Sequence, residues 1–130
     1  MISDKEDAVI YSRGYNRNFV KIDHLVVEEA RKMIEKVDSF EGFMILHATG
    51  GGTGSGLTSR VAETLSLDYC KKPKITYTLW PSPEQFKSTV EVYNSILCLD
   101  KLIDNSCLNI MLDNKQLYKK CQKLVSRTPL

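Results

Sequence analysis

The spacing of apolar residues predicts an alternation of helices and strands along the chain. In four segments, apolar side chains recur every three or four positions, which predicts amphipathic helices over residues 18–37, 57–69, 89–103 and 115–124. Three short runs of apolar, β-branched or aromatic residues predict strands over residues 42–47, 74–80 and 108–112. The first of these strands is a short run that is apolar from Phe43 to Leu46, so we expect it to be buried on both faces.

Strands that alternate with helices indicate parallel βαβ units. We therefore predict an α/β fold, a partial three-layer Rossmann-like parallel sheet with flanking helices, in one domain over residues 1–130. Ligands of open α/β sheets bind at the carboxyl ends of the strands. The loops after His47, Trp80 and Leu112 are consequently where we expect a site.

Composition narrows the class of protein. The chain is 42% hydrophobic and 26% charged, and its net charge of +2 does not predict a face that binds nucleic acid or an anionic membrane. It has no apolar run of about 18 residues, so no membrane span is predicted and we expect a soluble intracellular protein. Four scattered cysteines without a Cys-x-x-Cys pair indicate reduced thiols and no metal site.

Five of the seven glycines fall within residues 50–56, between a predicted strand and a predicted helix. At such a position backbone amides can converge on an anion at the positive end of the helix dipole, and the missing Cβ atoms let the backbone approach it. A flexible Gly/Ser connector is the alternative. Connections in compact α/β units are normally two to six residues long, which disfavours a flexible one here.

This loop fits neither of two common phosphate-binding patterns. The P-loop needs a lysine directly after its second glycine, where this chain has Leu57. The Gly-x-Gly-x-x-Gly fingerprint needs a third glycine at position 55 or 57, and these are Ser55 and Leu57. A nicotinamide-dependent oxidoreductase is therefore disfavoured. A lysine-free cradle of backbone amides remains, with the hydroxyls of Thr53 and Ser55.

The sequence Gly-Gly-Gly-Thr-Gly-Ser-Gly at residues 50–56 resembles the signature loop of tubulins, which prokaryotic filament-forming relatives share in looser form. Further segments resemble the α-tubulin version of the chain in the same register, namely residues 5–8 with 11–14, 65–69 with 71–72, 93–97, and 113–114 ahead of Tyr118. The resemblance extends over nearly all of the chain.

The resemblance implies a GTP-binding structural constituent of microtubules, and it assigns roles to matching positions. It assigns phosphate contacts to Gly51, Gly52, Thr53 and Gly54. It assigns the ribose to Glu91 and the guanine edge to Asn114. Ala48 also falls near the phosphates, where α-type relatives carry a serine, so a backbone amide remains there without the hydroxyl.

The same resemblance implies Mg²⁺ beside GTP, with Asp7 and Ala8 matching the family's loop near the phosphates and metal. The family's first nucleotide loop, its main metal-ligand loop and its hydrolysis-triggering domain have no counterpart in these 130 residues. We therefore expect part of a GTP-binding domain, without catalytic residues of its own. GTPase activity is implied by the resemblance alone.

Read without the family, two of these residues have structural explanations. Glu91 suits a solvated carboxylate at a helix start, and Asn114 suits a helix cap. His47 and Trp80 are interpreted as structural.

Two functions remain open for the whole chain. The first is a tubulin-like GTP-binding polypeptide of the cytoplasm and cytoskeleton, with a β-tubulin-like heterodimer partner, microtubules and tubulin-folding chaperones as partners. The alternative is a non-polymerising interaction fragment that binds tubulin or its chaperones without nucleotide.

Overall fold

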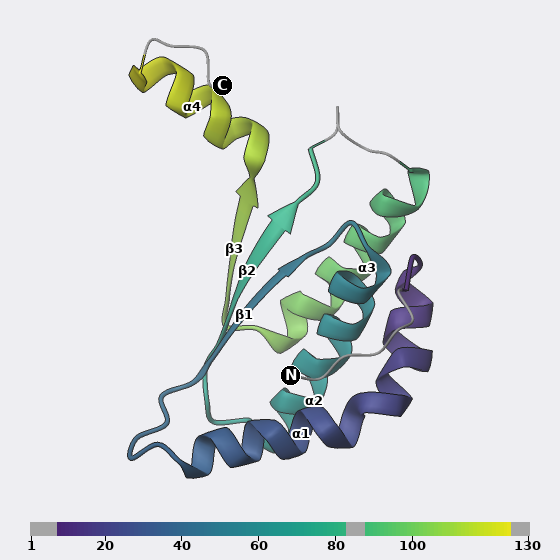
Figure 1. The fold of residues 1–130 in the computed structure, drawn as a ribbon, viewed down its shortest axis with the longest axis vertical. Coiled ribbons are helices and arrows are strands. Elements are labelled where there is room, and N and C mark those ends of the chain that lie inside the picture. Colours follow the sequence, from purple (N-terminus) through teal and green to yellow (C-terminus); the bar gives the residue numbers. More distant parts are fainter. Residues whose placement is uncertain (1–7, 83–87, 126–130) are drawn as a thin grey trace.

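Three parallel strands form a single sheet in the order β1-β2-β3 (Figure 1). This computed structural model describes residues 8–82 and 88–125, without the side chains of residues 17–23 and 125. The strands are β1 (Phe43–Ala48), β2 (Lys74–Trp80) and β3 (Leu108–Asp113). The α-helices are α1 (Phe19–Glu35), α2 (Thr58–Asp68), α3 (Thr89–Asn105) and α4 (Asn114–Val125), and two π-helical segments, η1 (Arg13–Asn18) and η2 (Thr53–Leu57), lead into α1 and α2.

Every predicted helix and strand is present, with ends displaced by at most two residues. Strands connected through helices and paired in parallel confirm the predicted α/β fold class. The parallel register aligns His47 with Thr78 and Trp80 with Asp113, so the three strands end at the same edge. The loops that follow them therefore meet in space.

The two faces of the sheet differ in what covers them. Helices α2 and α3 lie together on one face, whereas α4 extends beyond the end of the sheet (Figure 1). Side chains alternate between faces along a strand, so every second residue of β1 points to the uncovered side. Met44 and Leu46 are 63% and 73% exposed there. Our prediction that β1 is buried on both faces is wrong, because the described helices cover only one.

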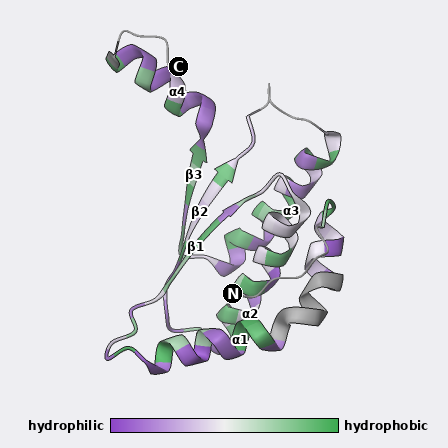
Figure 2. Ribbon diagram, in the orientation of Figure 1, coloured by the Kyte–Doolittle hydropathy of each residue, from purple (hydrophilic) through white to green (hydrophobic). Residues whose placement is uncertain are grey.

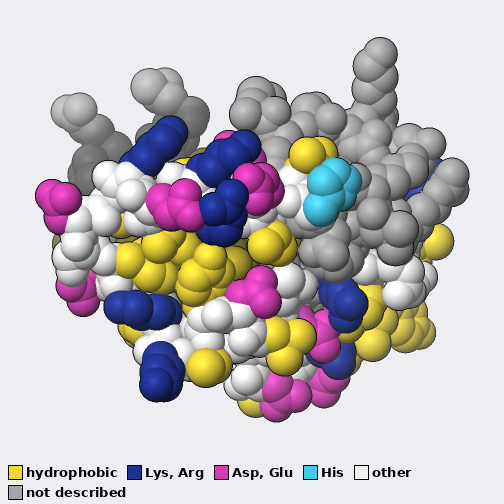
Figure 3. All heavy atoms as spheres, turned by 90° about the horizontal axis from the view of Figure 1, so that it is seen from below, with side chains coloured by type: hydrophobic (Ala, Val, Ile, Leu, Met, Phe, Trp, Pro, Cys, Tyr) yellow, Lys and Arg dark blue, Asp and Glu magenta, His cyan; other side chains and the backbone are white. Residues whose placement is uncertain are grey.

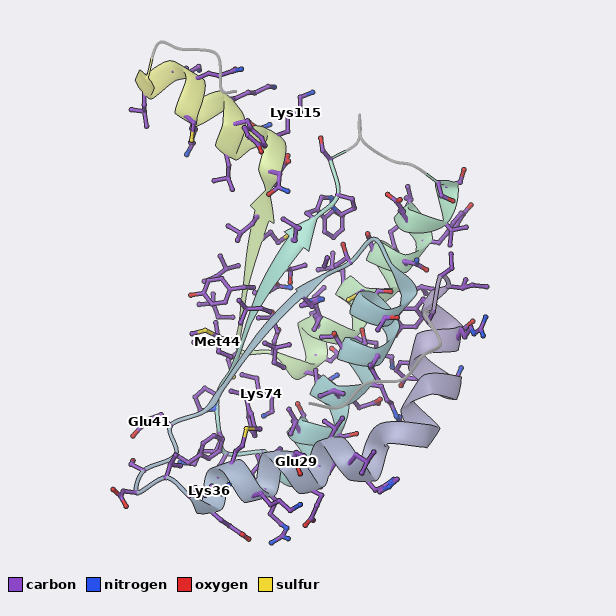
Figure 4. The ribbon with its side chains drawn as sticks, viewed as in Figure 1. Glu29, Lys36, Glu41, Met44, Lys74 and Lys115 are labelled. Atoms are coloured by element: carbon purple, nitrogen blue, oxygen red, sulfur yellow. The ribbon has the colours of Figure 1, made fainter. Side chains whose placement is uncertain are left out.

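Polar side chains line much of the covered face. Thr76 and Thr78 of β2 are fully buried beneath the helices. Lys74 is also buried, and its Nζ donates to the carbonyl oxygens of Tyr69 and Lys72 at 3.0 and 2.9 Å. In Figure 4, Lys74 lies on the helix side of the sheet and Met44 on the opposite side. The covered face thus buries polar side chains as well as apolar ones.

A small apolar core lies between the sheet and the helices. Its buried members are Tyr11, Ala62, Cys98 and Leu102, and Tyr15 and Ile45 pack against them. The rings of Tyr11 and Tyr15 stack with centroids 5.5 Å apart. Burial raises the pKa of Tyr11 to about 12, with the Ser59 hydroxyl acting in the opposite direction. The segment before α1, which contains Tyr11 and Tyr15, therefore packs in the core.

Helices α1 and α4 carry mixed polar and apolar surfaces. Along α1, Arg31 pairs with Glu28 and Glu35, and Figure 3 shows basic and acidic side chains interspersed beside a hydrophobic patch. Along α4, hydrophilic and hydrophobic residues alternate (Figure 2), and Leu117 and Tyr118 are exposed. The described part of the surface seen in Figure 3 thus carries no large patch of a single charge.

Candidate functional site

A cavity of about 620 Å³ lies at the carboxyl ends of the strands, where the sequence predicts a site. Small-molecule sites in proteins are typically of this size. The loops after all three strands contribute to it, together with the start of α3 and the segment before η1. Its described lining residues are Ala8, Val9, Ala48, Gly50, Gly51, Leu79, Trp80, Pro81, Ser82, Ser88, Val90, Glu91, Asn94 and Asn114.

Four of the seven predicted nucleotide residues line this cavity: Ala48, Gly51, Glu91 and Asn114. They come from three separate segments of the sequence, namely the end of β1 with the loop after it, the start of α3 and the start of α4, which the fold brings together. The other three, Gly52, Thr53 and Gly54, are not among its lining residues. Ala8 also lines the cavity, whereas Asp7 lies outside the described residues.

The glycine loop has an open part and a packed part. Around Gly51, a Cβ atom would meet nothing within 4 Å. At Gly54, a Cβ atom would lie 2.2 Å from the carbonyl oxygen of Ala48, closer than any real side chain is found. No glycine of the chain has a left-handed φ. The glycines are therefore explained by space: Gly51 leaves room on the cavity side, and Gly54 allows the loop to contact β1.

Thr53 joins the glycine loop to the segment before η1. Its N–H donates to the carbonyl oxygen of Ala8 at 3.1 Å, and its Oγ1 accepts from the N–H of Ala8 at 3.2 Å. Ser55 is fully buried and donates through Oγ to the carbonyl oxygen of Gly51 at 2.7 Å. Our expectation that the Ser55 hydroxyl faces an anion is wrong, because that hydroxyl closes the turn inside the protein.

Asn94 of α3 holds two walls of the cavity together. Its Oδ1 accepts from the N–H of Tyr11 at 2.8 Å, and its Nδ2 donates to the carbonyl oxygens of Val9 and Gly50 at 2.9 and 2.8 Å. Asn94 is 1% exposed, so these bonds satisfy a buried amide. Sequence reasoning assigned no role to this residue. A polar Asn94-Ser95 pair within a predicted amphipathic helix was the available signal.

The start of α3 also faces the cavity. Ser88 caps the helix by accepting the N–H of Val90 at 3.3 Å, and Glu91 lies in the first turn. Glu91 is the only charged side chain among the described lining residues. The described lining residues therefore offer a bound anion backbone N–H groups and the positive end of a helix dipole, with no lysine or arginine among them.

Asn114 does not cap α4 in the way that its sequence context suggests. Asp113 Oδ1 accepts the N–H of Lys115 at 2.8 Å, so the aspartate performs the capping. Asn114 is the first residue of α4 and lines the cavity. The interpretation of Asn114 as the helix cap is therefore wrong.

Comparison with known proteins agrees with this arrangement. Residues 1–122 match the GTPase domain of the Tubulin/FtsZ family. The chain is also 40% identical over 124 residues to a protein of Guillardia theta described as "Tubulin alpha chain, nucleomorph". The chain belongs to the Tubulin/FtsZ family. The aligned region covers 95% of this tubulin-type chain and 28% of that relative, so the chain spans less than a third of the relative's length.

The described residues contain neither a metal-binding cluster nor a membrane-spanning helix. Among the residues that the structure describes, no three histidine, cysteine, aspartate or glutamate side chains cluster as they would to hold a metal ion. Within the same described ranges, no helix is long and apolar enough to cross a membrane.

Proposed function

We propose that this chain binds a guanine nucleotide, GTP, in the cavity at the carboxyl ends of its strands. The observation that carries the proposal is the meeting of Ala48, Gly51, Glu91 and Asn114 around one cavity of suitable volume. The family match supports GTP as the ligand.

The phosphates belong at the open part of the glycine loop. The unobstructed side of Gly51 gives an anion access to the backbone, and the peptide of Ala48 lies at the end of β1 beside it. Gly52, Thr53 and Gly54 support this part of the site by packing and hydrogen bonding beneath it. Their contribution is to hold the loop in place, in addition to any contact of their amides with phosphate.

The two polar side chains of the cavity suit the rest of a nucleoside. The Glu91 carboxylate can accept hydrogen bonds from ribose hydroxyls. The Asn114 amide has both a donor and acceptors, and guanine presents both kinds of group on its edge. Leu79, Trp80 and Pro81 supply an apolar wall for the sugar and base. Bound Mg²⁺ would neutralise phosphate charge, which no lysine or arginine among the described lining residues does.

Binding of labelled GTP to the purified chain tests this proposal. We expect saturable binding that excess GTP displaces and excess ATP does not. Asn114→Ala should weaken GTP binding about tenfold by removing the contacts to guanine. Asn16→Ala, at an exposed asparagine of η1, is the matched control and should leave affinity unchanged. Absence of saturable binding, or equal behaviour of the two variants, contradicts the proposal.

The partners follow as a second part of the proposal. We propose that the chain supplies part of a tubulin-type GTP-binding domain in the cytoplasm and associates with tubulin subunits, a β-tubulin-like partner in microtubules included. Tubulin-folding chaperones are proposed as partners during folding. We assign GTP hydrolysis to the assembled protein and not to this chain alone. Co-sedimentation with polymerised tubulin, with and without GTP, tests the assembly.

One observation favours the alternative, a non-polymerising interaction fragment. The uncovered face of the sheet is apolar and exposed at Met44, Leu46 and Leu108, and such a face favours contact with another protein. Met44→Lys and Leu46→Glu would abolish association with tubulin if this face makes the contact. Association that persists in the Asn114→Ala variant and disappears in these two variants supports the alternative.

A further inference from the structure

A row of three polar side chains crosses the covered face of the sheet and ends at the glycine loop. His47 of β1 lies with Nδ1 2.9 Å from the carbonyl oxygen of Gly54 and with Nε2 3.0 Å from Oγ1 of Thr78 on β2. Oγ1 of Thr78 lies 2.8 Å from Oδ1 of Asn109 on β3. Each strand contributes one residue, so the sheet connects β3 to the loop.

The hydrogens in this row can be placed by counting donors and acceptors. The carbonyl oxygen of Gly54 has no hydrogen, so Nδ1 of His47 must donate to it. A neutral imidazole has one N–H, which makes Nε2 an acceptor and requires the Thr78 hydroxyl to donate. That hydroxyl has a single hydrogen. Asn109 must then donate to Thr78 through its amide nitrogen.

The amide of Asn109 supports this assignment. With Oδ1 directed at Thr78, Nδ2 is buried and has no hydrogen-bond partner among the residues that the structure describes. The oxygen and nitrogen of an amide have nearly the same shape and are assigned from their hydrogen bonds. Exchanging them directs Nδ2 at Thr78, where it donates to the hydroxyl. Every contact from Asn109 to the Gly54 carbonyl then joins a donor to an acceptor around a neutral His47.

A charged His47 reverses the direction of the hydrogen bonds in the row. An imidazolium donates from both nitrogens, so Thr78 would donate to Oδ1 of Asn109 and the buried Nδ2 would stay without a partner. Burial lowers the pKa of His47, and the Gly54 carbonyl opposes this shift more weakly. Titratable side chains of α2 and α3, which cover this face, are Arg60, Glu63, Asp68, Glu91, Tyr93, Cys98, Asp100, Lys101 and Asp104. Lys74 and Asp113 lie on the strands, and Tyr11 and Tyr15 lie in or against the core.

We infer that His47 is a positioning residue of the glycine loop: neutral and protonated on Nδ1, it holds the Gly54 carbonyl against the sheet, and Thr78 and Asn109 fix that tautomer. A carbonyl oxygen repels phosphate, so holding it on the sheet side leaves the N–H side of the loop for the anion. This consequence for nucleotide binding rests on the proposed function. The tautomer and the hold on the loop do not.

The tautomer is tested without nucleotide by nitrogen-15 NMR of the imidazole rings at pH 7.5. The chain has two histidines, and His24→Asn assigns the signals by removing the exposed one. We expect His47 to carry its proton on Nδ1, with Nε2 unprotonated. An Nε2-protonated ring or an imidazolium overturns the inference.

Two substitutions separate the hold on the loop from general packing. The amide nitrogen of His47→Asn falls near the place of Nδ1 and can still donate to Gly54, whereas that of His47→Gln falls near Nε2 and cannot. We expect amide hydrogen exchange over residues 50–57 to stay within about twofold of the unsubstituted chain in His47→Asn and to accelerate about tenfold in His47→Gln. His24→Asn is the matched control.

GTP affinity should follow the same order, near the original value in His47→Asn and about tenfold weaker in His47→Gln. Equal exchange rates in the two variants, or an unchanged rate in His47→Gln, overturn the inference. If neither the unsubstituted chain nor any variant binds GTP, the proposed function fails while the exchange contrast still decides the role of His47. If His47→Gln fails to fold, the NMR tautomer and the rescue by His47→Asn decide it.

Discussion

The two parts of the glycine loop use the same residue for different physical reasons. At Gly51, the space that a side chain would occupy is empty and opens on the cavity. At Gly54 and Gly56, a Cβ atom would lie 2.2 and 2.1 Å from the carbonyl oxygens of Ala48 and Tyr11. One part of the loop leaves room for a ligand, and the other part leaves room for the protein's own backbone.

This difference shows how a short motif can combine a site with its support. The packed part contacts β1 and the segment before η1, which are both walls of the cavity. The open part is held from α3 through the hydrogen bond between Asn94 and Gly50. Substitutions in the packed part should therefore act on stability first, and substitutions in the open part on ligand binding first.

The largest expected effect is that of Gly54→Ala. The added methyl group overlaps the backbone of Ala48, so the loop or the end of β1 must move. We expect the free energy of unfolding to fall by roughly 3 kcal/mol, measured by urea denaturation followed by circular dichroism. Gly51→Ala is the matched control and should change stability by no more than about 0.5 kcal/mol. Equal losses in the two variants would remove the distinction between the two parts.

Asn94→Ala tests how the open part is held. It leaves the N–H of Tyr11 and the carbonyl oxygens of Val9 and Gly50 without their partner. We expect a loss of roughly 2 kcal/mol in the free energy of unfolding, because buried polar groups lose their hydrogen bonds. Asn105→Ala is the control, since the Asn105 side chain donates to the carbonyl oxygen of Lys101 within the same helix, and it should cost about 0.5 kcal/mol. A loss no greater than that of the control would show that the Asn94 hydrogen bonds do not hold the loop.

Gly51→Val should act on ligand binding with little effect on folding. Its side chain enters the open space beside the backbone, where the proposed phosphates lie. We expect GTP affinity to fall about tenfold, which corresponds to about 1.4 kcal/mol, in a titration with a fluorescent GTP analogue. The thermal midpoint should stay near that of the unsubstituted chain. Unchanged affinity in a folded Gly51→Val variant would place the phosphates elsewhere.

Local patterns sufficed to predict the fold class and the helices and strands. The three- and four-residue spacing and the short apolar runs located each element, because those patterns reflect which side chains an element buries. They did not predict which face of β1 would be covered. Met44 and Leu46 are as apolar as buried residues, and only the arrangement of α2 and α3 shows that their side is open.

The sequence predicted where the candidate site lies better than it predicted the role of each residue in it. The strand-end rule and the family resemblance indicated Ala48, Gly51, Glu91 and Asn114, which the fold brings to one cavity. Asn94 was missed because its importance comes from long-range hydrogen bonds to Val9 and Tyr11, which no local pattern encodes. Ser55 was assigned to the ligand side because composition alone does not show on which side of a turn a hydroxyl lies.

The smallest expected effect concerns pH and the link between the packed part of the loop and the sheet. The pKa of His47 is lowered by burial from its ordinary value of 6.5, so the unfolded chain takes up this proton at higher pH than the folded chain does. The stabilisation from neutral His47 is complete above pH 6.5 and decreases as the pH falls through the lowered folded-state pKa, by at most about 1.4 kcal/mol per pH unit.

Urea denaturation at several pH values between 5 and 7.5 measures this slope. The pKa of Glu63 is lowered by its bond from the Tyr15 hydroxyl, and it contributes a similar loss only below its ordinary value of 4.5, outside this range. His47→Asn should flatten the slope because its amide does not titrate, and His24→Asn should leave it as it is. A slope that persists in His47→Asn would mean that another group titrates in this range and that His47 does not cause the pH dependence. The Gly54 carbonyl would then be held to the sheet without any dependence on pH.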